Sequence, residues 1–182
     1  MSSLDPRAPL VVDTRDLGRR PGALRTLTRT VPAPARLEVS LVRVVEGSDV
    51  ALDLRLESVV DGVLVSGTAR ARASGECGRC LEPVDQAVQV DLRELFVYPG
   101  TEADEDAPRM QGDLLDLEPL LRDAVVLELP LQPVCRADCP GLCPECGVRL
   151  AEDPGHDHPA VDPRWAVLEH LVQGTTDERL EK

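Results

Sequence analysis

The chain has 182 residues with an apolar share of 42%, which suffices for one core, but a single Phe, Tyr and Trp provide no stacking platform for bases. Its net charge of −13 excludes a protein that coats nucleic acid by bulk electrostatics. No charged region leads into an apolar run at the N-terminus, and no segment approaches the roughly 18 apolar residues of a membrane span. We therefore expect a cytoplasmic protein without a membrane partner.

Residues 1–35 are predicted to form an extended N-terminal arm. The segment is rich in proline and has little periodicity, apart from an apolar anchor at residues 10–12. It is basic in an otherwise acidic chain, so a direct contact with RNA would be local and electrostatic. The candidate RNA-binding residues are Arg15, Arg19, Arg20, Arg25 and Arg29.

From Leu37 onward the hydropathy pattern has a period of two, which is typical of strands with one buried face. Strands are expected near residues 37–45, 49–58, 62–74 and 84–97. Turn residues separate the first three runs, at Gly47 to Asp49 and at Asp61-Gly62. The pattern predicts an antiparallel meander.

Residues 101–118 carry many acidic residues with glycine and proline nearby, and are interpreted as a solvated loop. The functional alternative is an acidic surface that mimics nucleic acid or docks a basic ribosomal protein. Apolar residues then follow at helical spacing over residues 117–127, where Asp116 can cap the first turn. A second helix is expected to begin at Asp162-Pro163 and to present an apolar stripe that starts at Trp165.

These elements predict an α+β fold in which an antiparallel β meander packs with two helices. A C-terminal zinc-binding lobe and the extended N-terminal arm complete it. The expected divisions are 1–35 for the arm, 36–134 for the sheet with its acidic loop and packing helix, and 135–182 for the Cys/His lobe and the last helix.

Six cysteines in a reducing compartment are better interpreted as metal ligands or redox thiols than as disulfides. Two Cys-x-x-Cys pairs, at Cys77 and Cys80 and at Cys143 and Cys146, have the spacing of zinc knuckles. Four further candidates surround the second pair. The candidate metal ligands are Cys77, Cys80, Cys135, Cys139, Cys143, Cys146, His156 and His158.

Eight ligands fit two four-coordinate structural zinc ions. One partition gives the first four cysteines one ion and leaves Cys143, Cys146 and the two histidines for the other. The alternative joins the two knuckles around a single ion and leaves four candidates spare. Spacing alone does not separate one ion from two.

Other interpretations compete with each assignment. A Cys-x-x-Cys pair can be a redox dithiol, although neither pair has the helix N-terminus of a thioredoxin-like site. Cys135 and Cys139 can be ordinary buried thiols, and His170 is interpreted as a surface or packing residue. The chain has no G-x-S-x-G, P-loop or H-E-x-x-H motif, so we expect no enzyme, no catalytic residues and no small-molecule substrate.

The order of the motifs resembles the YceD family, the large ribosomal RNA subunit accumulation proteins. The resemblance extends from about residue 10 to 173, and four segments carry it: Cys77-Gly-Arg-Cys80-Leu-Glu-Pro, Asp113-Leu-Leu-Asp-Leu-Glu-Pro-Leu-Leu, Cys135-x-x-x-Cys139-Pro-Gly-Leu-Cys143-Pro-Glu-Cys146-Gly, and Asp162-Pro-Arg-Trp-Ala-Val-Leu. His156-x-His158 departs from a Cys-x-Cys pair of many relatives, a conservative change for zinc.

The resemblance implies a non-enzymatic factor for the synthesis, processing or stability of 23S ribosomal RNA during large-subunit assembly. Its partner would be the 23S precursor or an assembly intermediate. The alternative is a zinc-stabilised adaptor that docks a basic ribosomal protein through the acidic loop. A zinc-poised redox sensor is a third hypothesis.

Overall fold

The computed structural model describes residues 3–158. The chain divides into two compact units, Met1–Cys139 and Pro140–Lys182. The first unit contains every strand and helix that the structure describes. No helix within residues 3–158 is both long and apolar enough to cross a membrane.

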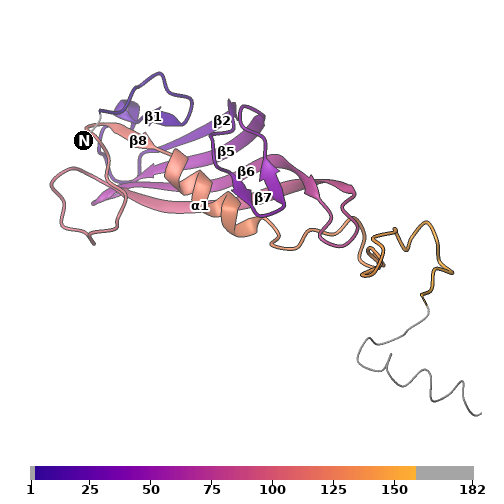
Figure 1. Cartoon of the computed structure of the whole chain (residues 1–182). Helices are drawn as coiled ribbons and strands as arrows, with labels where there is room; N and C mark the ends of the chain where they lie inside the picture. Colours follow the sequence, from indigo (N-terminus) through magenta and orange to yellow (C-terminus); the bar gives the residue numbers. More distant parts are fainter. Residues whose placement is uncertain (1–2, 159–182) are drawn as a thin grey trace, which may run out of the picture. The chain divides into compact units, whose positions relative to one another are not determined.

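A six-stranded antiparallel sheet forms the first unit (Figure 1). Its strands are β2 (Leu24–Pro32), β3 (Glu38–Val39), β4 (Val42–Val44), β5 (Asp49–Ser58), β6 (Gly62–Glu76) and β7 (Pro83–Val97). β6 is the centre of the sheet, because it pairs with β7 along one edge and with β5 and then β4 along the other. The order across the sheet is therefore β7, β6, β5, β2, and the β3–β4 hairpin extends the β5 side.

One face of the sheet is buried and the other is wet. The alternation is clear in β5, where Val50, Leu52, Leu54 and Leu56 are buried and the residues between them are exposed. The helix α1 (Glu118–Glu128) covers the buried face and contributes Leu121 and Val125 to the core. A two-stranded sheet of β1 (Val11–Asp13) and β8 (Leu114–Asp116) packs into the same core (Figure 1).

The expectation of a meander packed with two helices is wrong. The molecule is mainly β-sheet, and α1 is the one α-helix within residues 3–158. α1 lies where the pattern at residues 117–127 placed it, and Asp116 accepts a hydrogen bond from the Glu118 backbone N–H at 2.9 Å. The helix expected from Asp162 lies outside the described residues.

The expectation of an extended N-terminal arm is also wrong. Residues 24–32 form β2, which pairs with β5 over nine residues of register. The strand was hidden because Arg25 and Arg29 occupy its inward positions, where an apolar residue is expected. Their guanidinium groups reach the backbone carbonyls of Asp13 (3.0 Å) and Val11 (3.5 Å), which lets these side chains lie against the core.

The single strand expected at residues 37–45 is a tight hairpin. β3 and β4 are separated by Ser40 and Leu41, and Ser40 has a positive φ of 34°. β4 then pairs with residues 73–75 at the end of β6. This arrangement brings Leu41 to the segment that follows β6, since the Glu76 N–H donates to the Leu41 carbonyl at 3.1 Å.

Candidate metal centres

The first group of cysteines is built on the turn between β6 and β7. The Cys77 N–H donates to the Glu82 carbonyl at 2.8 Å, and the Leu81 N–H donates to the Cys77 carbonyl at 3.0 Å. Leu81 has a positive φ of 61°, which closes the knuckle. The turn directs Cys77 and Cys80 to the same side, and both side chains are buried.

The chain returns to this turn after α1. The Gly78 N–H donates to the Pro133 carbonyl at 2.8 Å, and the Arg79 guanidinium donates to the Cys139 carbonyl at 3.1 Å. These bonds bring Cys135 and Cys139 beside the knuckle. All four sulfurs lie within 4.8 Å of one another. The turn and the segment after α1 thus form one cage of four sulfur atoms.

The sulfur spacing fits a tetrahedral ion. A Zn–S bond of about 2.3 Å places neighbouring sulfurs about 3.8 Å apart in a tetrahedron. The Cys77–Cys139 and Cys80–Cys135 sulfurs are 3.9 Å and 3.6 Å apart. Cys77, Cys80 and Cys139 are buried, while Cys135 is exposed. Four thiolates would close the coordination sphere and leave no position for a substrate.

The four thiols do not ionise alike. Burial opposes ionisation of Cys77, but hydrogen bonds from the backbone N–H groups of Cys135 and Arg79 outweigh it and lower its pKa to about 6. A hydrogen bond with the Cys80 thiol, together with burial, raises the pKa of Cys135 to about 12. Burial also raises the pKa of Cys80. One thiolate is therefore favoured by the protein alone, and a metal ion would supply the charge that ionises the others.

The second group belongs to the unit that begins at Pro140. Cys143 and Cys146 flank a tight turn, in which the Gly147 N–H donates to the Cys143 carbonyl at 2.9 Å and the Cys143 N–H donates to the Val148 carbonyl at 2.8 Å. Gly147 has a φ of 75°, a conformation that favours glycine. His156 and His158 complete the group, and all four ligand atoms lie within 4.8 Å of one another.

This group is tighter and more exposed than the first. The Nε2 atoms of His156 and His158 lie 3.1 Å and 3.3 Å from the Cys146 sulfur and 2.8 Å from each other. Bond lengths of about 2.0–2.1 Å and 2.3 Å around zinc require about 3.6 Å for N···S and 3.3 Å for N···N. The ligand types therefore fit zinc, and the group must open by a few tenths of an ångström to hold it. Cys146 is exposed and Cys143 is buried.

Each histidine of the second group has a carboxylate close to its Nδ1 atom. The Nδ1 atom of His156 lies 3.5 Å from an Asp153 carboxylate oxygen, and that of His158 lies 3.4 Å from a Glu145 carboxylate oxygen. A carboxylate on the far nitrogen orients the ring and leaves Nε2 for a metal. The spacing of the cysteines and histidines does not identify Asp153 or Glu145. Their one signal in the sequence is position, because Asp153 lies three residues before His156 and Glu145 lies next to Cys146.

Hydrogen bonds from the backbone N–H groups of Cys146 and Glu145 to the sulfur lower the pKa of Cys143 to about 6. Each group therefore contains one thiol that is prepared for ionisation. The two Cys-x-x-Cys pairs belong to different groups, and the grouping is the four-and-four partition described above. Metal occupancy of both groups stays a prediction.

A family model of the "Large ribosomal RNA subunit accumulation protein YceD" matches residues 65–172. An uncharacterized protein of Mycobacterium tuberculosis is 51% identical over 175 residues, which cover 93% of this chain and 84% of the relative. The chain belongs to the YceD family.

Further relatives include a second mycobacterial protein and a plant protein. An uncharacterized protein of Mycobacterium leprae is 47% identical over 171 residues, which cover 91% of this chain and 78% of the relative. A maize protein is named "Large ribosomal RNA subunit accumulation protein YCED homolog 1, chloroplastic". It is 26% identical over 182 residues, which cover 82% of this chain and 56% of the relative. No solved structure matches the chain. The family match spans all eight candidate ligands.

In this YceD family member the five arginines of the predicted RNA contact are largely engaged within the chain. Arg15 pairs with Asp13, Arg19 lies 3.6 Å from the Asp113 carboxylate, and Arg25 lies 2.8 Å from the Asp16 carboxylate. The Nε atom of Arg29 is buried without a hydrogen-bond partner, and burial lowers the pKa of its guanidinium. Arg20 is exposed and has no ion pair among the described residues.

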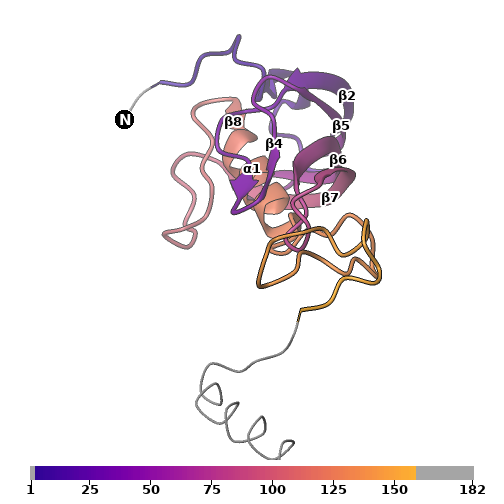
Figure 2. The same ribbon diagram turned by 45° about the vertical axis from the view of Figure 1, so that its right-hand side comes forward.

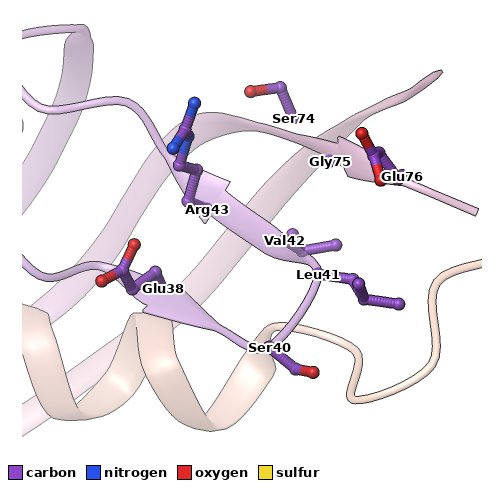
Figure 3. Close-up of a pocket in the computed structure, with 8 residues that line it drawn as sticks. All are labelled: Glu38, Ser40, Leu41, Val42, Arg43, Ser74, Gly75 and Glu76. Atoms are coloured by element: carbon purple, nitrogen blue, oxygen red, sulfur yellow. The ribbon is translucent and has the colours of Figure 1, made fainter. Parts of the chain in front are cut away.

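A hollow of about 380 Å³ lies between the β3–β4 hairpin and the end of β6 (Figure 3). Glu38, Arg43 and Glu76 present charges around it, and Ser40 and Ser74 present hydroxyl groups. Among these described residues no hydrogen bond joins a serine hydroxyl to a carboxylate. This hollow therefore contains no serine nucleophile that is hydrogen-bonded to a neighbouring carboxylate base.

Proposed function

We propose that this protein is a non-enzymatic factor that supports synthesis, processing or stability of 23S ribosomal RNA during large-subunit assembly. Membership in the YceD family, whose name refers to accumulation of the large ribosomal RNA, is the observation that carries the proposal. The two ligand groups support it, because closed sets of four cysteine and histidine ligands stabilise folds rather than activate substrates.

Zinc is the ion proposed for both groups. Thiolate and imidazole ligands in sets of four favour zinc over magnesium or calcium, which prefer oxygen ligands. In the first group the ion would join the β6–β7 turn to the segment after α1. In the second it would hold residues 140–158, a stretch in which the structure describes no helix or strand. In both groups zinc would stabilise the fold and would not take part in a reaction.

Direct RNA contact through Arg15, Arg19, Arg20, Arg25 and Arg29 remains part of the proposal. Three of these side chains are ion-paired within the chain, which lowers the charge they present. Arg20 is the one member that is exposed and has no ion pair among the described residues. If the contact is electrostatic, affinity for 23S fragments will fall steeply with salt, and a triple Arg→Ala variant will flatten the slope of log affinity against log salt by about two units.

A second candidate is an adaptor that docks a basic ribosomal protein. The observation in its favour concerns Arg109, the one basic residue in the acidic loop. Its guanidinium donates to the Thr101 carbonyl at 3.1 Å and approaches the Ala103 carbonyl at 3.4 Å. The nearby acids stay exposed without an ion pair among the described residues: Glu102, Asp104, Glu105 and Asp106.

Depletion of the protein, followed by complementation, tests the function. The ratio of 23S to 16S RNA should fall on depletion and recover with the wild-type chain. An unchanged ratio would remove the assembly proposal. Gel shifts with 23S fragments, set beside pull-downs of ribosomal proteins, then separate the candidates. Reversal of the four loop acids should abolish the pull-down if the chain is an adaptor and leave it intact if the chain binds RNA.

A further inference from the structure

β7 forms one margin of the sheet and has a free edge. It pairs with β6 along its whole length, and within the described residues no strand pairs with its other side. Figure 2 shows β7 and β2 at opposite margins of the sheet, with α1 on the buried face. An open edge strand exposes a row of N–H and C=O groups that can pair with another chain.

Three contacts identify the backbone groups that point outward. The Val97 N–H donates to the Pro108 carbonyl at 2.9 Å, the Met110 N–H donates to the Val97 carbonyl at 3.0 Å, and the Leu95 N–H donates to the Glu94 side chain at 3.1 Å. None of these acceptors or donors lies on β6. Because alternate residues of a strand face the same neighbour, the odd-numbered residues of β7 direct their polar backbone groups away from β6.

Both ends of this edge are closed. Pro83 has no N–H to offer at the start of the strand. Glu94 and the loop at residues 108–110 occupy the edge at Leu95 and Val97. The residues between them that point their backbone groups outward are all exposed: Asp85, Ala87, Gln89, Asp91 and Arg93. The open stretch therefore runs from 85 to 93, and Gln89 is its midpoint.

We propose that a second copy of this chain pairs with the open stretch, β7 antiparallel to β7, about a twofold axis at Gln89. This register is the one that pairs all five outward residues. It places Asp85 opposite the partner's Arg93, twice by symmetry, and Ala87 opposite the partner's Asp91. Each of these is a hydrogen-bonded pair of an antiparallel ladder.

Charge complementarity selects a copy of the same chain for this edge. Arg93 is exposed and has no ion pair among the described residues. Asp85 contacts Arg72 at 2.7 Å, yet its side chain is 59% exposed and can accept a second guanidinium. β2, at the opposite margin, offers no such pair, because its two charged residues are both arginines and their side chains lie on the inward face.

The buried face of β7 needs nothing from the partner. Val88, Val90 and Leu92 are already buried in the core of their own subunit. The new interface is therefore a backbone ladder with side chains from the wet face, which is small for a permanent dimer. Association should depend on concentration.

Charge reversal tests the register, with sedimentation equilibrium of the full chain as the measurement. Asp85→Arg alone places two arginines opposite each other, and Arg93→Asp alone places two aspartates opposite each other. Each variant should dissociate at least roughly tenfold more readily than wild type. An equimolar mixture of the two variants restores both opposite-charge pairs and should dimerise like wild type. Residues 85 and 93 are about 27 Å apart along one strand, so rescue within a subunit is impossible.

Two further variants complete the test. Asp91→Arg makes the same charge change on the same face but opposite Ala87, and should leave the dimer intact. Ala87→Pro removes an outward N–H without touching the β6 ladder, and should abolish the dimer while circular dichroism stays unchanged. A chain that is monomeric at every concentration would overturn the proposal and leave the edge to an extended segment of another protein. A dimer that persists in both charge-reversed variants, or that their mixture does not restore, would also overturn it.

Discussion

The two ligand groups differ in what surrounds them. The four cysteines of the first lie at the end of a long β-ladder, and three of them are buried. The second has two cysteines and two histidines in a unit without strands or helices within residues 140–158. A metal in the first group would join elements that have their own hydrogen bonds, whereas a metal in the second would supply most of the order of residues 140–158. The same ion should therefore have different consequences in the two places.

Replacing Cys139 by Ser should give the largest effect on global stability. The change removes a buried ligand and separates the segment after α1 from the β6–β7 turn. Because structural zinc contributes folding free energy directly, we expect a loss of several kcal/mol and a clear fall in Tm. Thermal unfolding followed by circular dichroism measures it. A Cys139→Ser variant with the wild-type Tm would show that the first group is not a structural metal site.

Replacing Cys143 by Ser should act locally. The variant should lose order around residues 140–158 while the sheet keeps its stability, because within residues 3–158 every core residue lies in the first unit. Amide hydrogen exchange resolves the two regions: protection should fall around Cys143 and persist in β5, β6 and β7. Global unfolding in this variant would mean that the two units depend on one another.

Chelator competition should separate the groups kinetically. The side chains of His156 and His158 are 17% and 30% exposed, and Cys146 is exposed. Cys77 in the first group is 0% exposed. We expect the metal to be released in two phases, with the fast phase from the second group. The fast phase should vanish in Cys143→Ser and persist in Cys139→Ser. The reverse assignment would contradict the difference in accessibility.

Asp153→Asn should lower the metal affinity of the second group about 10- to 100-fold, because a carboxylate no longer orients the His156 ring. Competition against a zinc indicator measures the change. Asp157→Asn is a matched control, since Asp157 lies between the histidines and its side chain bonds the His158 backbone N–H. Equal losses in both variants would indicate a general charge effect.

The smallest effect concerns pH in the metal-free protein. The pKa values of Cys77 and Cys143 are lowered to about 6, below the usual value near 8.5. The unfolded chain then binds more protons between these values, so the free energy of unfolding should rise from pH 6 to pH 8.5. Cys135 titrates near 12 and does not contribute in this window. Denaturant unfolding at a series of pH values checks the sign, and a fall over this range would contradict it.

The strands with clean alternation were predictable from the sequence. β5, β6 and β7 lie close to the expected 49–58, 62–74 and 84–97. β2 was not, because its inward arginines break the apolar pattern and find carbonyl acceptors only in the folded chain. The turn at Ser40 escaped detection because the apolar run continues through it.

The sequence identifies the eight candidate ligands, but it does not show which four lie together. Spacing identifies Cys77 and Cys80 as a pair, yet their neighbours Cys135 and Cys139 lie more than fifty residues away and are brought in by the return of the chain after α1. The carboxylates behind the histidines depend on the local turn at residues 153–156, where the His156 N–H donates to the Asp153 carbonyl at 3.1 Å. Neither feature follows from periodicity.

Elemental analysis of the purified protein tests the central claim most directly, since the claim is that two separate groups each hold one structural zinc ion. The account predicts two zinc ions per wild-type chain and one in each of Cys139→Ser and Cys143→Ser. A folded wild-type chain without bound metal would contradict it, and so would a single ion that is lost in both variants.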